Sequence, residues 1–120
     1  MKFLIQGTEG NVVQHLLTGD TTFNVQLLND DGSPLSIASP AVVTIEYFSG
    51  KVRTDTPITA KTVTPGAGAA AGFGTLVISD LDVVPPRNTY YLWARYSSNG
   101  GTGAGATVLI ANVPAQIQVL

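Results

Sequence analysis

With 120 residues the chain has the length of one domain, and 12% charged against 44% apolar residues leave its surface unusually poor in charge. Six Lys and Arg side chains against eight Asp and Glu side chains give a net charge of -2, which excludes a basic surface for nucleic acid. Because cysteine is absent, disulfide frameworks and thiolate metal sites are excluded as well.

Residues 1–10 are predicted to form an N-terminal arm ahead of a β-sandwich domain at 11–120. The apolar start MKFLI begins like a signal peptide, but the polar run QGTEG interrupts it before an h-region is complete. No run approaches the roughly 20 apolar residues of a membrane span, so we expect an unsecreted chain without membrane contact. In the arm, Phe3 and Ile5 are candidates to add a strand to the open sheet edge of a neighbour.

Strict alternation of apolar and polar residues predicts the first long strand at 21–28, with Phe23, Val25 and Leu27 on one face. The run NDDG then favours a turn, and the next strand is predicted at 41–48. Further strands are predicted at 3–6, 12–17, 58–64, 75–79, 90–96, 107–111 and 116–120. Seven to nine short strands with a turn about every ten residues indicate an all-β fold, a single antiparallel β-sandwich.

Two Gly-rich loops are predicted, at 65–74 and 97–105. The runs GAGAAA and GTGAGA within or beside them fit the G-x-G-x-x-G/A pattern of a dinucleotide-binding turn. That turn needs a helix after it to hold the pyrophosphate, and both runs lead into strands instead. We therefore expect loops and no cofactor. Phe73 is the large apolar anchor of the first loop, which is expected to be disordered when free and to order on docking.

Catalytic and metal sites lack the residues that they require. His15 stands in an apolar stretch without a serine elbow or zinc spacing, which indicates a surface or sheet position and no enzyme. A calcium site at Asp30, Asp31, Asp80 and Asp82 was weighed against turn chemistry and a strand exit. Because no third acidic residue follows at calcium-loop spacing, we expect no metal.

The aromatic strand TYYLWARY at 89–96 has bulky residues on both faces. Tyr90, Leu92 and Tyr96 share one face with Ala94, so a second set, Tyr91, Trp93 and Arg95, lies on the other. One interpretation is a central strand whose second face is covered by a loop or by the N-terminal segment. The other is a protein interface, because Tyr, Trp and Arg are enriched at interface hot spots.

The run GDTTFNVQL at 19–27, the turn DDGSPL at 30–35 and the strand AVVTIEYF resemble the small immunoglobulin-like β-sandwich modules of tailed-phage virions. The N-terminal domain of baseplate upper proteins is similar, with a GDT step before a strand and a D-G-x-P-L turn before the next. The end of the chain, NTYYLWARY, ATVLIAN and AQIQVL, resembles the closing hairpin of that module. The resemblance spans residues 19–120 and implies a virion structural protein without catalytic residues.

Which virion component it is follows from how the chain differs from that pattern. The chain is expected to be a single module, since it has no heptads or collagen-like repeats of a stalk. A lone sandwich of this kind resembles a capsid decoration, or cement, protein, which implies the major capsid protein as partner and a homotrimer or other homo-oligomer in the virion. The alternatives are a tail, neck or baseplate adaptor, and a host-glycan binding module that uses Tyr91 and Trp93 for stacking.

Overall fold

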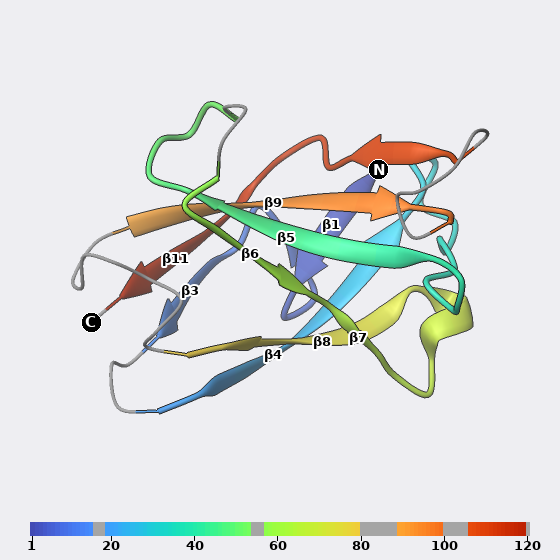
Figure 1. Cartoon of the computed structure of the whole chain (residues 1–120), viewed down its shortest axis with the longest axis horizontal. Coiled ribbons are helices and arrows are strands. Elements are labelled where there is room, and N and C mark those ends of the chain that lie inside the picture. Colours follow the sequence, from blue (N-terminus) through green and yellow to red (C-terminus); the bar gives the residue numbers. More distant parts are fainter. Residues whose placement is uncertain (16–18, 54–56, 80–88, 100–105, 120) are drawn as a thin grey trace.

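Two β-sheets packed face to face form the protein (Figure 1), in a computed structural model that describes residues 1–15, 19–53, 57–79, 89–99 and 106–119. The β4 sheet has the strand order β2-β1-β4-β8-β7, and the β9 sheet has the order β3-β11-β9-β5-β6, with β10 also paired to β9. The strands of the β4 sheet are β1 (Lys2–Ile5), β2 (Thr8–Glu9), β4 (Thr21–Leu28), β7 (Thr64–Pro65) and β8 (Phe73–Ile78). Those of the β9 sheet are β3 (Val12–His15), β5 (Val42–Phe48), β6 (Thr59–Thr62), β9 (Thr89–Ser97), β10 (Val108–Ile110) and β11 (Ala115–Val119).

The predicted all-β sandwich is confirmed, and its strand order is that of immunoglobulin-like domains. Strands β1, β4, β8 and β7 lie in the order A-B-E-D, and β11, β9 and β5 in the order G-F-C. All nine predicted strands form within the described residues, and two further strands, β2 and β7, have two residues each.

The core lies between the two sheets and is built from the alternate residues that the sequence pattern assigns to one face. Phe23, Val25 and Leu27 of β4 face Ile45 and other residues across the sandwich, and all of them are buried. The inward residues of the β9 sheet are Val43, Ile45, Tyr47, Tyr90, Leu92, Ala94, Ile117 and Val119. Burial of these apolar side chains is the main stabilising term of the fold.

One strand pair departs from the predicted antiparallel arrangement. β3 runs parallel to β11, with Val13 opposite Ile117. Gln6 and Gly7, both with positive φ, form the turn between β1 and β2, and after β2 the chain passes through Gly10, also with positive φ, to join the opposite sheet at β3. Since β3 and β11 come from opposite ends of the described chain, no hairpin turn imposes antiparallel pairing on them.

The prediction of a free N-terminal arm at 1–10 is wrong. β1 pairs with β4 along its whole length, from Lys2 opposite Leu28 to Ile5 opposite Val25. Phe3 and Ile5 are fully buried in the core, because their side chains fill the space between the sheets. Residues 2–5 are therefore an internal strand of the sandwich and are not available to a neighbour's sheet edge.

The Gly-rich segment 65–74 is a compact turn in place of the predicted flexible loop. It contains the 3-10 helix η1 (Ala69–Ala71), and the Ala69 carbonyl accepts a hydrogen bond from the Ile37 N–H at 2.9 Å. Gly72 ends the helix with a φ of 88°, and a side chain there would collide with the Leu27 carbonyl oxygen. These glycines serve close backbone packing. Of the second loop, 97–105, only 97–99 lie within the described residues, and Ser97 still belongs to β9.

Candidate functional site

The outer face of the β9 sheet is the surface on which three of the predicted interface residues meet. β9 pairs with β5 on one side and with β10 and β11 on the other, so it is a central strand, as one of the two interpretations expected. Tyr91, Trp93 and Arg95 alternate with buried residues along β9 and are half-buried on the outer face. In register with them, Trp93 is opposite Glu46 and Tyr91 is opposite Phe48 on β5.

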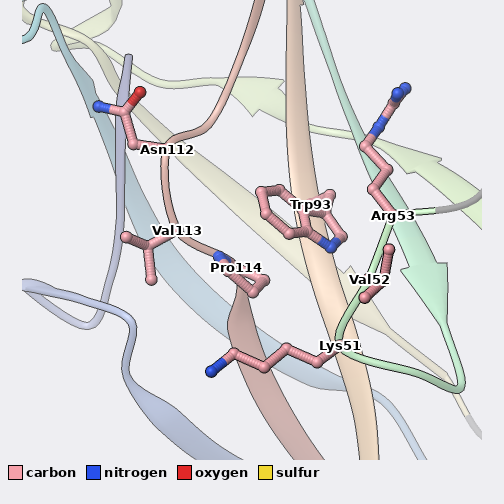
Figure 2. A pocket seen from close by; sticks show the side chains of 7 residues that line it. All are labelled: Lys51, Val52, Arg53, Trp93, Asn112, Val113 and Pro114. Carbon is pink, nitrogen blue, oxygen red and sulfur yellow. The ribbon is translucent and has the colours of Figure 1, made fainter.

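Trp93 forms the floor of a cleft of about 610 Å³ on this face (Figure 2). The indole lies between two chain segments, 51–53 after β5 and 112–114 between β10 and β11. The residues that line the cleft are Lys51, Val52, Arg53, Trp93, Asn112, Val113 and Pro114. Of the two interpretations of β9, a covered strand and an interface, neither is excluded by the cleft, since two loop segments flank Trp93 without closing over it.

The segment 51–53 supplies positive charge to one side of the cleft. Arg53 donates from Nε and Nη2 to the same oxygen of Glu46, Oε1, at 3.1 and 2.7 Å. This pair holds the guanidinium beside β5, next to the indole that stands opposite Glu46. Lys51 has no carboxylate partner among the residues that the structure describes. Val52 is 77% exposed and presents an apolar side chain to solvent at the rim.

The segment 112–114 forms the opposite side, where the edge of the sheet is interrupted. β10 and β11 pair with β9 as two separate strands because the register shifts between Ile110, opposite Arg95, and Ala115, opposite Leu92, and Pro114 within this break has no N–H to donate to the ladder. Between them the Ala111 N–H donates to the Ala94 carbonyl, and the Asn112 N–H donates to the Met1 carbonyl, both at 2.9 Å. The interruption brings Val113 and Pro114 to the cleft.

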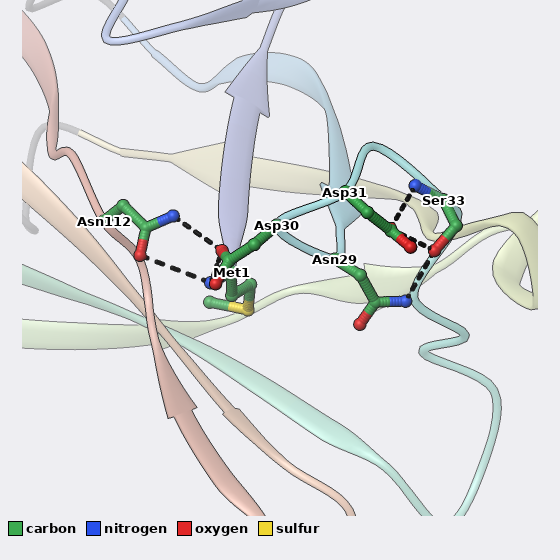
Figure 3. A network of polar contacts seen from close by, with 6 residues as sticks. All are labelled: Met1, Asn29, Asp30, Asp31, Ser33 and Asn112. Atoms are coloured by element: carbon green, nitrogen blue, oxygen red, sulfur yellow. Dashed lines mark hydrogen bonds and ion pairs between the residues drawn. The ribbon is translucent and has the colours of Figure 1, made fainter.

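A polar clamp at the N-terminus holds this segment in place (Figure 3). The Met1 ammonium donates to Asp30 Oδ1 at 2.6 Å, and Asn112 Nδ2 donates to the same oxygen at 2.7 Å. The hydrogen bond from the ammonium, followed by that from Asn112, lowers the pKa of the Asp30 carboxyl from its ordinary 3.8. Asn112 thus connects the wall of the cleft to the N-terminus and to the turn after β4.

The indole of Trp93 is held by packing, without an acceptor for its N–H in the part of the chain that the structure describes. Nε1 is buried and finds no hydrogen-bond partner among the described residues, while the ring packs against the core cluster. A buried donor without a partner costs about 1–3 kcal/mol, so the ring keeps this position at the expense of stability. The adjacent Phe48 is buried but lies outside the core between the sheets, which shows that the outer face is itself packed near Tyr91.

Exposed apolar side chains gather on this side of the sandwich. Seven large apolar residues are exposed among the described residues, and four of them lie on the outer face of the β9 sheet or at the cleft. These four are Val12, Val52, Val108 and Val113. They lie on the same side of the sandwich as the half-buried aromatic residues of β9, and exposed apolar side chains gathered on one side are typical of surfaces that bind partners.

The other predicted interface residues lie elsewhere. Phe3 and Ile5 are core residues, so their assignment to an interface is wrong: neither side chain reaches the surface. Phe73 is 46% exposed but lies on β8, in the β4 sheet, with its ring against Gly68. The structure therefore does not bring Phe73 together with Trp93.

His15 and the acidic residues have local roles. His15 is a fully buried sheet residue whose Nδ1 lies 2.8 Å from Thr21 Oγ1. Asp31 accepts hydrogen bonds from the N–H and Oγ of Ser33, which lower its pKa, as turn chemistry requires. Asp80 and Asp82 lie outside the described residues. Within the described ranges, no three His, Asp or Glu side chains converge on a common point.

Sequence reasoning missed both walls of the cleft. Lys51, Val52 and Arg53 carry no motif, and only the register of β5 against β9 places them beside Trp93. Pro114 gave a usable signal, because a proline between two predicted strands marks a break in a sheet edge. The clamp of Met1, Asp30 and Asn112 joins residues far apart in the sequence and had no local signal.

Neither a protein-family model nor a curated protein sequence matches this chain. No helix in the described part of the chain has the length and apolar character needed to cross a bilayer. The geometry of the cleft itself indicates what it can do. Its lining offers an aromatic ring, aliphatic side chains, one amide and two cationic groups, which suit binding by burial and ion pairing.

Proposed function

We propose that this protein is a non-enzymatic structural component of a tailed-phage virion, specifically a capsid decoration protein that binds the head lattice and stabilises it. The observation that carries the proposal is the outer face of the β9 sheet, where Trp93 lines an open cleft and shares its face of the strand with Tyr91 and Arg95. The resemblance of residues 19–120 to virion sandwich modules is the reason to propose a phage virion as the particle. The outer face of the β9 sheet is the surface that we propose docks on it.

The composition of the face supports docking to another protein. Tyr, Trp and Arg are the residue types most enriched among hot spots, which lie at the centre of interfaces and are fully desolvated on binding. Interface cores are also poor in charged residues, as is this chain with its 12%. Trp93 is of a hot-spot residue type and lies at the cleft with exposed Val52 and Val113 beside it.

On this proposal the partner is the major capsid protein, and the chain acts as a homotrimer or other homo-oligomer on a particle assembled in the host cytoplasm. Repeated contacts on a lattice raise the overall affinity through effective concentration, without new contacts at any one site. A modest cleft is then sufficient for stable attachment.

Two other functions use the same face. A tail, neck or baseplate adaptor differs from a decoration protein only in its partner. A host-glycan binding module is favoured by one observation, the half-buried indole of Trp93 at the bottom of an open cleft with Asn112 at its wall. Sugar rings stack on such indoles, so this function predicts saturable quenching of Trp93 emission by soluble glycans, and the other two do not.

The decisive experiment combines light scattering on the purified chain with sedimentation of empty phage heads in its presence. We expect an oligomer that sediments with the heads at a fixed ratio to the major capsid protein. Trp93→Ala should reduce the bound fraction, while Val77→Ala, which removes an exposed valine from the β4 sheet, should not. A chain that stays in the supernatant at every concentration would rule out the head and make the tail adaptor the leading proposal.

A further inference from the structure

We infer that the Trp93 cleft binds an extended acidic segment of another protein, in which an aliphatic residue or proline is flanked on both sides by carboxylates. The inference rests on the docking role proposed above and adds the chemistry of the partner, whichever particle that partner belongs to. It follows from three features of the outer face of the β9 sheet: its charge, the placement of its cations and its apolar floor.

The charge of the face is opposite to that of the chain. Although the net charge of the protein is -2, the described residues around the cleft include three cationic side chains, Lys51, Arg53 and Arg95, against two carboxylates, Glu46 and, behind Asn112, Asp30, which pairs with the Met1 ammonium. Glu46 already pairs with Arg53. Within the described residues neither Lys51 nor Arg95 has an acidic partner, and carboxylates of a bound segment would supply one.

The same charges disfavour a second copy as the occupant. In a two-fold dimer through this face, each Lys51 and Arg95 would meet a surface with the same excess of positive charge. Like charges brought together at an interface cost several kcal/mol and suppress that pairing. Complementary charge on a different protein, by contrast, both accelerates encounter and fixes the orientation of the bound segment.

The register of the strands places the two free cations on opposite sides of Trp93. Arg95 lies two residues further along β9 and pairs with Ile110, on the side of Asn112. Lys51 follows the end of β5, where Phe48 pairs with Tyr91, on the other side of the indole. In an extended peptide, alternate side chains point the same way and are about 7 Å apart. An acidic-x-apolar-x-acidic pattern therefore matches this surface.

The floor and extent of the face favour a peptide over a small ligand. The indole of Trp93, with Val113 and Pro114 on one side of it and Val52 on the other, offers an apolar slot between the two walls (Figure 2). Exposed Val108 and Val12 continue the apolar surface well beyond the cleft, on β10 and β3. A segment that runs along β9 covers this surface, whereas a ligand confined to the cleft leaves it exposed.

The test selects binders for the whole chain from a library of random twelve-residue peptides displayed on a carrier. We expect the enriched sequences to contain Asp or Glu two residues on either side of Pro, Val, Ile or Leu. The most enriched peptide is then synthesised and titrated while the emission of Trp93, the only tryptophan of the chain, reports occupancy. Binding should weaken as salt is added, because the flanking pairs are partly exposed.

Variants separate this mode of binding from non-specific attraction. Lys51→Gln and Arg95→Gln should each weaken binding of the peptide roughly two- to fivefold, as loss of an exposed ion pair does. Lys2→Gln removes one positive charge from the β4 sheet and should leave the affinity unchanged. Trp93→Ala should weaken binding by about thirtyfold or more, measured by calorimetry because this variant lacks the reporter.

Four results would overturn the inference: enriched peptides without acidic residues, no enrichment over the Trp93→Ala protein, equal effects of Lys51→Gln and Lys2→Gln, or a Trp93 emission that depends on protein concentration alone. The last would assign the cleft to a second copy. Head sedimentation tests the proposed function independently. If heads bind the parent chain and acidic peptides do not, the inference fails and the decoration role stands. If acidic peptides bind and heads do not, the reverse holds.

Discussion

His15 illustrates how a single polar residue is accommodated between the sheets. Its imidazole is fully buried, and Nδ1 is within 2.8 Å of the hydroxyl of Thr21, whereas Nε2 has no partner among the described residues. One hydrogen bond therefore offsets part of the cost of burying this ring. Thr21 begins β4 with its side chain toward the core, and its neighbour Thr22 points to solvent.

Thr21→Val tests the importance of that hydrogen bond. The substitution keeps the shape of the side chain and removes the hydroxyl, which leaves both nitrogens of His15 without a partner in the described structure. We expect a loss of about 1–3 kcal/mol in the free energy of unfolding, measured by urea denaturation. Thr22→Val is the matched control and should change stability by less than about 0.5 kcal/mol, because that side chain is exposed. Equal effects of the two substitutions would show that the bond contributes nothing.

At the scale of elements, the sequence predicts where strands form but not which strands pair with one another. TTFNVQLL and AVVTIEYF alternate so regularly that both strands and their buried faces follow from period two alone. The strands β2 and β7 have two residues each, which is too short to show an alternating pattern in the sequence. Phe3 and Ile5 were assigned to a free arm because an alternating pattern shows which residues share a face but does not show which sheet receives them.

The candidate site was predictable only where it lies on a strand. Tyr91, Trp93 and Arg95 share the outer face as their spacing requires. The cleft around Trp93 depends on segments 51–53 and 112–114, which are brought together by the pairing of β9 with β5 on one side and with β10 and β11 on the other. Such long-range register is fixed by the packing of the whole core and leaves no trace in local composition.

Phe3 and Phe73 are both predicted interface residues, but only Phe3 is buried in the core. Replacing each with alanine tests this difference through the free energy of unfolding. Phe3→Ala removes a fully buried ring from β1, and we expect a loss of about 3–5 kcal/mol in the free energy of unfolding. Phe73→Ala, at a half-exposed position on β8, should cost about 1 kcal/mol or less. Both are measured by thermal and urea unfolding of the full chain. A small effect of Phe3→Ala would mean that β1 is detachable, and the arm would have to be reconsidered.

At the scale of the whole molecule, three distant segments meet at one end of the sandwich. The N-terminus, the turn after β4 and the segment between β10 and β11 are joined by the oxygen Oδ1 of Asp30. The backbone of Asn112 adds a further bond to the carbonyl of Met1. The clamp therefore links the first strand to both sheets and holds one wall of the Trp93 cleft (Figure 3).

The clamp predicts how stability depends on pH. Because the ammonium of Met1 and the amide of Asn112 lower the folded pKa of Asp30 below 3.8, the ionised carboxylate is favoured in the folded state. Its contribution to stability is present above 3.8 and is lost as the pH falls through the folded value. Asp30→Asn should therefore lower the Tm near neutral pH, and the difference from the parent should close in acid.

The measurement is a series of thermal melts from about pH 6 downward on chains whose retention of Met1 is verified by mass spectrometry. Asp20→Asn is the control, since its carboxylate has no acidic or basic partner in the described structure, and we expect little difference in Tm at any pH. Asp31 also has a lowered pKa, but its partner Ser33 is in the same turn, so Asp31→Asn reports local turn chemistry without disturbing the N-terminus. A Tm difference for Asp30→Asn that persists unchanged in acid would contradict the clamp, because a protonated Asp30 can no longer pair with the ammonium.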